Sequence, residues 1–176
     1  MKNNKWTKYT IDQLVMICNE KIDSKILNKF NYVSATNLLP NIGGLIPAES
    51  IPSSRVTKFK KGDILFSNIR PYFKKLLYAT FDGGCSNDVI VFRSKEEIIP
   101  KFFYYLISQQ YFIDFLTASS KGTKMPRGDK DAIKKFEFYV PSRNIQEKIT
   151  NILSSIDSKI ELNNQINEKL EETAKA

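Results

Sequence analysis

Histidine is absent from the 176 residues of this chain. Without it the sequence cannot supply a Ser-His or Cys-His nucleophile pair, an HExxH zinc helix or a histidine proton shuttle. Cysteine is scarce as well, because Cys18 and Cys85 are the only two and neither has a nearby cysteine to complete a zinc site or a disulfide framework. Most simple hydrolase classes are therefore excluded, and a reducing cytoplasm is the expected environment.

Long hydrophobic runs and cofactor motifs are also missing. The apolar runs are far shorter than the roughly 18 to 20 residues that span a bilayer, and the start MKNNKWTKYT lacks the apolar stretch of a signal peptide. The chain has no Asn/Asp-Pro-Pro-aromatic motif typical of adenine methyltransferases and no glycine-rich phosphate loop. We therefore expect no membrane partner, a cytoplasmic location, and no catalytic residue, metal ligand or cofactor site in this chain.

Positive charge prevails and is unevenly distributed. The formal net charge is +8, but residues 145–176 carry four lysines against six acidic residues, so the rest of the chain holds +10. Such an excess favours a polyanion such as nucleic acid, because each neutralised phosphate releases condensed counterions. The alternative is that the lysines serve solubility or reflect an AT-rich genome.

Hydrophobic periodicity predicts an α+β fold. Helical spacing of apolar residues predicts a short helix within residues 10–23. Residues 30–92 alternate short β-branched and aromatic runs with turn signals, which is typical of a small β-rich body. Residues 101–119 predict one long helix that is mostly core, and the run FEFYVP predicts a strand that ends at Pro141. We expect one domain over residues 1–143.

The remainder, residues 144–176, contains no proline or glycine and predicts a long helix. Asn144 followed by Glu147 resembles a capping box that would open it. Apolar residues recur every seven positions, interrupted by Lys159 and by Asn163, a residue type that fixes register at core positions. The pattern predicts a coiled-coil-like interface with a partner helix. Its predicted interface residues are Ile145, Ile149, Ile152, Ile156, Ile160, Asn163, Ile166 and Leu170.

Residues 67–75, SNIRPYFKK, combine two kinds of DNA-contacting chemistry. Arg70 can present a bidentate fork to guanine and Asn68 can pair with adenine, while neighbouring lysines can neutralise phosphates. The alternative is structural, with Tyr72 and Phe73 in the core behind a turn at proline, and we expect this especially of Phe73. The candidate DNA-binding residues of this segment are Asn68, Arg70, Tyr72, Lys74 and Lys75.

A second candidate loop, residues 120–130, reads SKGTKMPRGDK. Its glycines allow close backbone approach and its cations suit phosphates, although an ordinary solvated loop has the same composition. Thr123 and Arg127 are the candidates for base contacts. The full set of candidates here is Lys121, Thr123, Lys124, Arg127 and Lys130.

Together these segments resemble half of a DNA-specificity (S) subunit of type I restriction-modification enzymes. The resemblance is carried by KKGDILFSNIRPYFKK (60–75), GTKMPRGDKDAIKKFEFYVPS (122–142) and, most specifically, QEKITNILSSIDSKIELNNQINEKLEE (146–172). The last segment looks like the helical conserved region of the family, and the residues before it look like one target-recognition domain.

The resemblance implies a noncatalytic subunit that reads a short half-site in double-stranded DNA and recruits modification (methyltransferase) subunits. Those subunits would supply S-adenosylmethionine binding and adenine N6 methylation, and a restriction subunit that uses ATP with Mg²⁺ would be a further partner. Family members usually carry two recognition domains and two such helices, whereas this sequence holds one of each. Either two copies pair through the terminal helix as a homodimer and read a bipartite palindrome, or the chain is a truncated form.

Two alternative functions are also consistent with the sequence. An interaction or inhibitory adaptor would bind modification subunits without reading DNA, and its binding would lack the steep salt dependence of DNA recognition. A nuclease with an unrecognised site would cleave DNA alone with Mg²⁺ or Mn²⁺.

Overall fold

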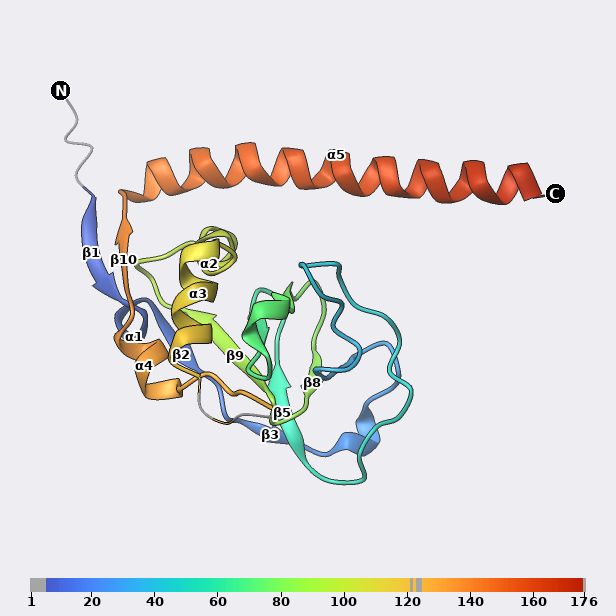
Figure 1. Cartoon of the computed structure of the whole chain (residues 1–176), viewed down its shortest axis with the longest axis horizontal. Helices are drawn as coiled ribbons and strands as arrows, with labels where there is room; N and C mark the ends of the chain where they lie inside the picture. The colour runs from blue at the N-terminus through green and yellow to red at the C-terminus, as the bar shows by residue number, and fades with distance from the viewer. Residues whose placement is uncertain (1–5, 121, 123–124, 176) are drawn as a thin grey trace.

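The computed structural model describes residues 6–120, 122 and 125–175. Strands and short helices form a body, and one long helix runs across it (Figure 1). The described helices are α1 (Ile11–Leu14), α2 (Pro100–Ile107), α3 (Gln110–Ala118), α4 (Lys130–Lys135) and α5 (Arg143–Lys175), with 3-10 turns η1 (Ser24–Ile26) and η2 (Pro71–Phe73). The predicted α+β class with a long C-terminal helix is confirmed.

The described strands form two four-stranded sheets and one two-stranded ribbon. The first sheet has the order β2 (Val15–Ile17), β9 (Val89–Ser94), β6 (Ile64–Ser67), β7 (Leu76–Tyr78). The second has the order β3 (Lys21–Ile22), β5 (Val56–Phe59), β8 (Gly83–Cys85), β4 (Tyr32–Val33). The ribbon pairs β1 (Thr7–Thr10) with β10 (Glu137–Val140). Strands β4 and β8 run parallel, and the other pairs named here are antiparallel.

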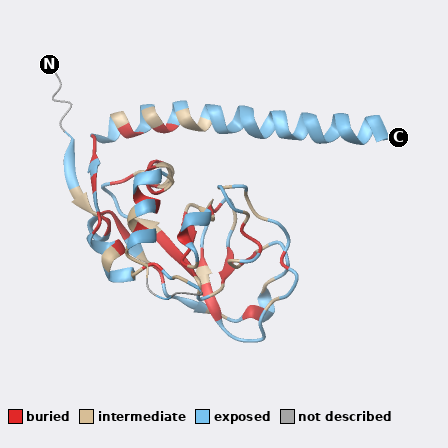
Figure 2. Ribbon diagram, viewed as in Figure 1, coloured by how far each residue is buried: buried red, intermediate tan, exposed pale blue. Residues whose placement is uncertain are grey.

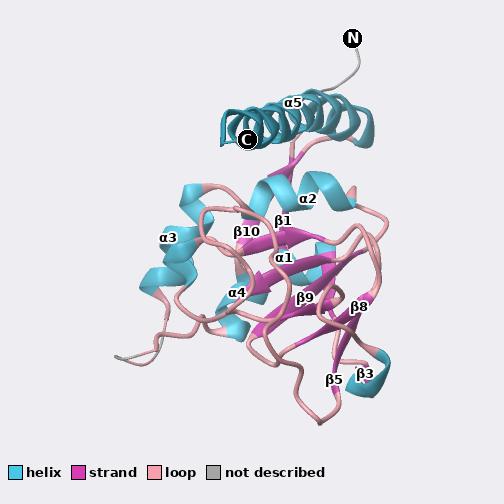
Figure 3. Cartoon of the chain, turned by 90° about the vertical axis from the view of Figure 1, so that its right-hand side faces the viewer, coloured by secondary structure: helices cyan, strands magenta, loops and turns pink. Residues whose placement is uncertain are grey.

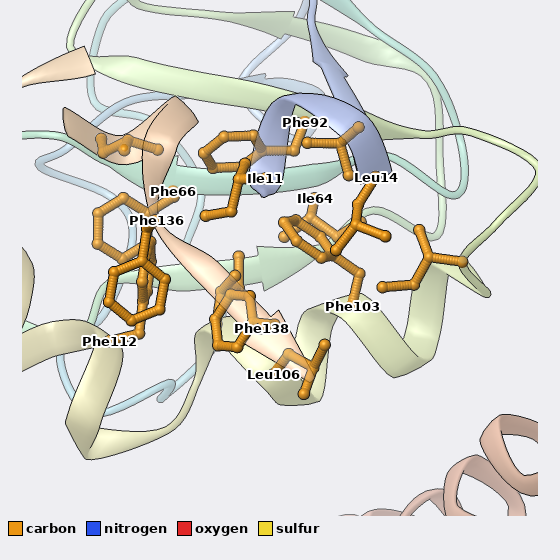
Figure 4. Packing of buried hydrophobic residues seen from close by; sticks show 14 of the residues in the cluster. Ile11, Leu14, Ile64, Phe66, Phe92, Phe103, Leu106, Phe112, Phe136 and Phe138 are labelled. Carbon is orange, nitrogen blue, oxygen red and sulfur yellow. The ribbon is translucent and has the colours of Figure 1, made fainter. Parts of the chain in front are cut away.

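The first sheet is buried on both faces, which explains the unbroken apolar runs in its strands. Along β6, Ile64 and Phe66 join the larger core with the helices, whereas Leu65 joins a smaller core with residues of β5 and β8. Along β9 the same alternation places Ile90 in the larger core and Val91 in the smaller one. Figure 4 shows how the phenylalanines of the strands and helices interdigitate in the larger core.

The prediction of one helix within residues 10–23 is wrong beyond the first turn. Helix α1 ends at Leu14, and the chain continues directly into β2 and then β3. The N–H of Val15 closes the short helix by donating to the carbonyl of Ile11, after which Val15 pairs with the edge of β9. β-Branched residues suit a strand, and the open edge of β9 outweighs the helical spacing.

The single helix predicted over residues 101–119 is interrupted. It forms α2 and α3, separated by Ser108 and by Gln109, whose backbone is extended. Both short helices contribute buried side chains to the larger core, so the prediction that this segment is mostly core is confirmed. The strand predicted before Pro141 is present as β10.

Helix α5 spans 33 residues, and its hydrogen bonds and ion pairs with the body lie between Arg143 and Asp157 among the described contacts. It begins at Arg143, and the carbonyl of Ser142 accepts bonds from the N–H groups of Ile145 and Gln146. Asn144 therefore lies inside the first turn, and the capping box predicted from it does not open the helix. Figure 2 shows α5 changing from partly buried to exposed, and Figure 3, viewed nearly along its axis, shows it lying over α2 at one side of the body. Within the described ranges, no helix is both long and apolar enough to cross a membrane.

Candidate nucleic-acid interface

The two loops predicted to contact DNA, loop 67–75 and the described part of the second, loop 125–130, lie against each other. A backbone bridge joins Ile69 to Arg127. The N–H of Arg70 donates to the carbonyl group just before Arg127 at 2.9 Å. Two segments that the sequence presents separately thus form one continuous surface at the end of β6.

Asn68 fastens these loops together from the inside. Its side-chain amide nitrogen donates to the backbone carbonyl of Gly128 at 3.1 Å, and the backbone carbonyl of Asn68 accepts from the Gly128 N–H at 3.2 Å. A Cβ atom on Gly128 would lie 2.8 Å from Asn68 Oδ1, so any other residue here would force the Asn68 side chain to shift. Asn68 is only 7% exposed. This geometry does not support the prediction that Asn68 pairs with adenine. The side chain is buried, its amide nitrogen already bonds Gly128, and its Oδ1 is buried without a partner among the described residues; Asn68 positions the two loops instead.

Arg70 and Lys74 flank the turn η2 and hold it in an unusual conformation. Both have φ of 49°, in the left-handed region that side chains other than glycine rarely adopt. The Arg70 side chain is exposed and lines a hollow together with Ser67, Phe73 and Asp88. Its guanidinium is therefore accessible to a ligand on this surface.

The prediction that Phe73 is a core residue is wrong. Phe73 is 39% exposed and Tyr72 is 46% exposed, with their ring centroids 4.8 Å apart. Pro71 takes the buried position in the turn. The two rings extend the same surface with an apolar edge that suits sugar or base contacts.

Lys75 has a structural partner. Its ammonium donates to the carbonyl of Ala35 at 2.6 Å and so ties loop 67–75 to the segment around residue 35. The ammonium keeps further N–H donors, but Lys75 is half-buried and contributes to the shape of the loop as well as to its charge.

Arg127 is held by Asp88, a residue that the sequence reasoning missed. The Nη2 atom of Arg127 lies 2.9 Å from Oδ1 of Asp88, and the Asp88 carbonyl accepts the Asn68 N–H at 2.7 Å. Asp88 stands in the turn between β8 and β9, far from both loops in the sequence. No local pattern marks it, and only the sheet brings it to this surface.

Lys130 occupies a neighbouring position as the first residue of α4, where it is exposed. It lines a smaller polar hollow beside Lys21 and Asn87, and the Lys21 ammonium donates to Asn87 Oδ1 at 2.7 Å. The remaining candidates of the second loop, Lys121, Thr123 and Lys124, lie outside the described residues.

The clearest pKa shifts at buried groups belong to the body behind this surface. Burial raises the pKa of the Cys85 thiol to about 12. Asp63, nearly buried, accepts a two-pronged bond from Arg93 at 2.8 and 2.7 Å, which raises the pKa of Arg93. Among the residues with described positions, no group of three acidic, cysteine or histidine side chains could hold a metal ion.

The start of α5 is clamped to the body by Gln146. Its carbonyl oxygen accepts the N–H of Ile99 at 2.9 Å, and its amide donates to the carbonyls of Glu97 and Pro141 at 3.1 and 3.0 Å. Gln146 is 2% exposed, and all of these bonds fix the direction in which the helix leaves the body.

A second contact braces α5 three turns further along. The Tyr105 hydroxyl donates to Asp157 at 2.6 Å and lies 3.1 Å from Ser154 Oγ. The Lys101 ammonium lies 3.7 Å from Asp157 and over three tyrosine rings. Burial, and after it the hydrogen bond to Asp157, raise the pKa of Tyr105 to about 12, while the contact with Ser154 acts in the opposite direction.

The predicted interface residues of α5 divide into two groups. Ile145 and Ile149 are partly buried, and Ile149 packs on the larger core. The others are exposed along the helix from residue 152 onward, where large apolar side chains would be costly to hydrate. These are Ile152, Ile156, Ile160, Asn163, Ile166 and Leu170.

Residues 3–172 match the family described as the type I restriction modification DNA specificity domain, and the chain belongs to this family. It is 25% identical to the HindI specificity subunit of Haemophilus influenzae, over 97% of this chain and 39% of that protein. It is 29% identical to the EcoDI specificity subunit of Escherichia coli, over 82% of this chain and 33% of that protein. The chain thus spans less than half the length of these relatives.

Solved structures of the same kind share the fold. The HsdS subunit from Thermoanaerobacter tengcongensis has a TM-score of 0.71 and 22% identity, covering 92% of this chain and 44% of that one. The S subunit from M. genitalium has a TM-score of 0.66 and 23% identity, covering 92% of this chain and 41% of that one.

Proposed function

We propose that this chain is a cytoplasmic, noncatalytic subunit that reads a short DNA half-site for a type I adenine methyltransferase complex. The observation that carries the proposal is the joining of loop 67–75 and loop 125–130 into one surface that displays Arg70 and Arg127. A domain with a net charge of +10 outside the terminal helix is suited to the phosphate backbone. Membership in the specificity family supports the same role.

Each side chain of this surface has a distinct role in the proposal. Arg70 and Arg127 contact base edges, since a guanidinium fork matches guanine. Lys74, Lys75 and Lys130 contact phosphates, and Tyr72 packs on the sugar or base. Of the candidates that lie outside the described residues, Lys121 and Lys124 are proposed to contact phosphates and Thr123 a base edge. Asn68 supports the loops from behind. Recognition thus combines phosphate contacts that position the domain with a few base contacts that specify the sequence.

Catalysis belongs to the partners in this proposal. Modification subunits bind S-adenosylmethionine and methylate adenine, and a restriction subunit adds ATP- and Mg²⁺-dependent activity. The subunit described here would require no cofactor of its own, and its role is to bring these partners to a defined sequence.

The exposed half of α5 is proposed to pair with a second copy of the chain. A stripe of isoleucine and leucine with Asn163 in its middle is the pattern of a helix that packs on a like helix. Two-fold pairing would place two recognition domains at a fixed separation and make the target a bipartite palindrome with a spacer.

The test is a map of adenine methylation by long-read sequencing in cells that express this chain with its modification subunit and no other specificity subunit. The proposal expects a new bipartite palindromic motif. A stable complex that leaves the genome unmethylated would instead favour the adaptor that binds modification subunits without reading DNA. Methylation at a motif with only one half-site would retain DNA reading and reject the pairing.

A further inference from the structure

The contact between Arg127 and Asp88 presents a hydrogen-bonding edge to solvent. Nη2 and Oδ1 are 2.9 Å apart, and the two side chains are 57% and 38% exposed. Among the described contacts this one uses a single N–H of the guanidinium, so Nη2 keeps a second N–H donor and Oδ1 keeps a second lone pair that can accept. The pair therefore shows donors on one side and an acceptor directly beside them.

The backbone on both sides of this pair is held firmly. Arg127 is bridged to Ile69, and the residue after it is fastened to Asn68. The Asp88 carbonyl accepts from the N–H of the same Asn68. An exposed ion pair contributes little to stability, about 0 to 1 kcal/mol. A contribution to stability therefore does not explain why the backbone holds Arg127 and Asp88 so firmly beside each other.

The order of donors and acceptors matches one type of base pair. In the major groove, a G·C pair shows two acceptors on guanine, N7 and O6, followed by the N4 donor of cytosine, whereas an A·T pair alternates acceptor, donor and acceptor. O6 and N4 are hydrogen-bonded to each other and so are about 2.9 Å apart. A donor and an acceptor at this same separation, as in Arg127 and Asp88, can contact both atoms at once.

We infer that Arg127 and Asp88 act as one unit that reads a single G·C pair in the major groove, with Arg127 on guanine and Asp88 accepting from cytosine N4. Asp88 is thereby a specificity-determining residue. The inference rests on the proposed function, and it adds a defined base pair and a second reading residue to it.

The experiment compares methylation by complexes of the modification subunit with wild-type chain, Arg127→Ala, Asp88→Ala and Asp88→Asn. After the wild-type motif is mapped, rates are measured on duplexes in which each position of one half-site is changed in turn. Both alanine variants should lose discrimination at the same G·C position by about 10- to 100-fold. Discrimination at the other positions should remain within about twofold of wild type.

A matched control is the nearby surface pair of Lys134 and Asp131 on α4, whose N–O distance is 3.3 Å. Replacing both residues by alanine removes the same charges and should leave the motif unchanged. Three results would overturn the inference while leaving the proposed function intact. Arg127→Ala could slow methylation equally at all positions, either alanine variant could lose discrimination at an A·T position, or both alanine variants could keep the wild-type motif. If the wild-type complex itself has no motif, the proposed function fails and the inference with it.

Discussion

The backbone N–H of Asn41 donates a 2.8 Å hydrogen bond to the carbonyl of Phe73, and the next N–H, that of Ile42, donates to the carbonyl of Lys74 at 3.0 Å. The four described residues other than glycine with positive φ are Asn41, Ile42, Arg70 and Lys74. The unusual backbone conformations of this chain are thus gathered where two loops are bonded together beside the proposed DNA contacts. Such conformations persist only when the surroundings hold them, and they are frequent at functional sites.

Lys74 allows the energetic cost of this arrangement to be measured. Lys74→Gly should raise the free energy of unfolding by about 0.5 to 1 kcal/mol, because glycine adopts the left-handed region without a Cβ clash. It should also weaken DNA binding and lower the slope of log affinity against log salt by about one, since one phosphate contact is lost. Lys74→Ala is the control, because it removes the charge and keeps the backbone penalty. It should weaken binding equally without the gain in stability, and a gain in both variants would contradict the explanation.

Gln146 is expected to be the most costly polar side chain to remove from α5. Gln146→Ala leaves the Ile99 N–H and two carbonyl groups without their partner and should lower the free energy of unfolding by about 2 to 3 kcal/mol in urea titrations. Gln165→Ala removes an amide of the same type from the exposed part of the helix, where it bonds only Glu161 among the described contacts. That variant should stay within about 0.5 kcal/mol of wild type. Equal effects would mean that Gln146 does not clamp the helix.

Self-association through α5 should depend on Ile156. This side chain is 47% exposed, so Ile156→Asp should leave the melting temperature of the isolated subunit nearly unchanged. Sedimentation at several concentrations should nevertheless show loss of the dimer, because the charge would be buried without a partner in a helix pair. Ser158→Asp places the same charge on another face of the helix. Pairing through the isoleucine stripe is rejected if both variants associate as wild type does.

The buried thiol of Cys85 should make the protein less stable at alkaline pH. Burial raises its pKa from 9.0 to about 12, so between these pH values the unfolded chain releases a proton that the folded chain keeps. The free energy of unfolding should therefore fall as pH rises above 9, with a contribution of up to about 1.4 kcal/mol per pH unit from this thiol. Urea titrations from pH 8 to 10.5 measure the slope, and Cys85→Ala should make it shallower. A thiol reagent at pH 8 should label Cys85 in urea and fail to label it in the folded protein.

The sequence predicted correctly those elements whose own hydrophobic periodicity determines their structure. The long helix α5, the strand β10 and the β-rich middle are present because their periodicity agrees with the surfaces they cover. The helix expected over residues 10–23 failed at Val15, since an open edge of β9 cannot be seen in the sequence. Tertiary pairing overrides a weak local preference in such short segments.

The candidate site was predictable in its composition and not in its geometry. The sequence marked both loops by their cations and turn residues, and it could not show that Gly128 lets Asn68 join them. Asn68 was predicted to contact a base because the sequence does not show whether an asparagine is buried or exposed. Asp88 carried no signal, because a lone aspartate in a turn becomes meaningful only once the sheet sets it beside Arg127.

The most direct test of DNA reading by this chain uses Arg70. Wild type and Arg70→Ala are each assembled with the modification subunit. The affinity of each complex is measured at several salt concentrations for a duplex that contains the motif found by methylation mapping and for a scrambled duplex of equal length. We predict that wild type prefers the motif by roughly a thousandfold or more at physiological salt. Arg70→Ala should lose about 1 to 3 kcal/mol on the motif and much less on the scrambled duplex. Equal loss on both duplexes, or no preference in wild type, would contradict sequence recognition by this surface.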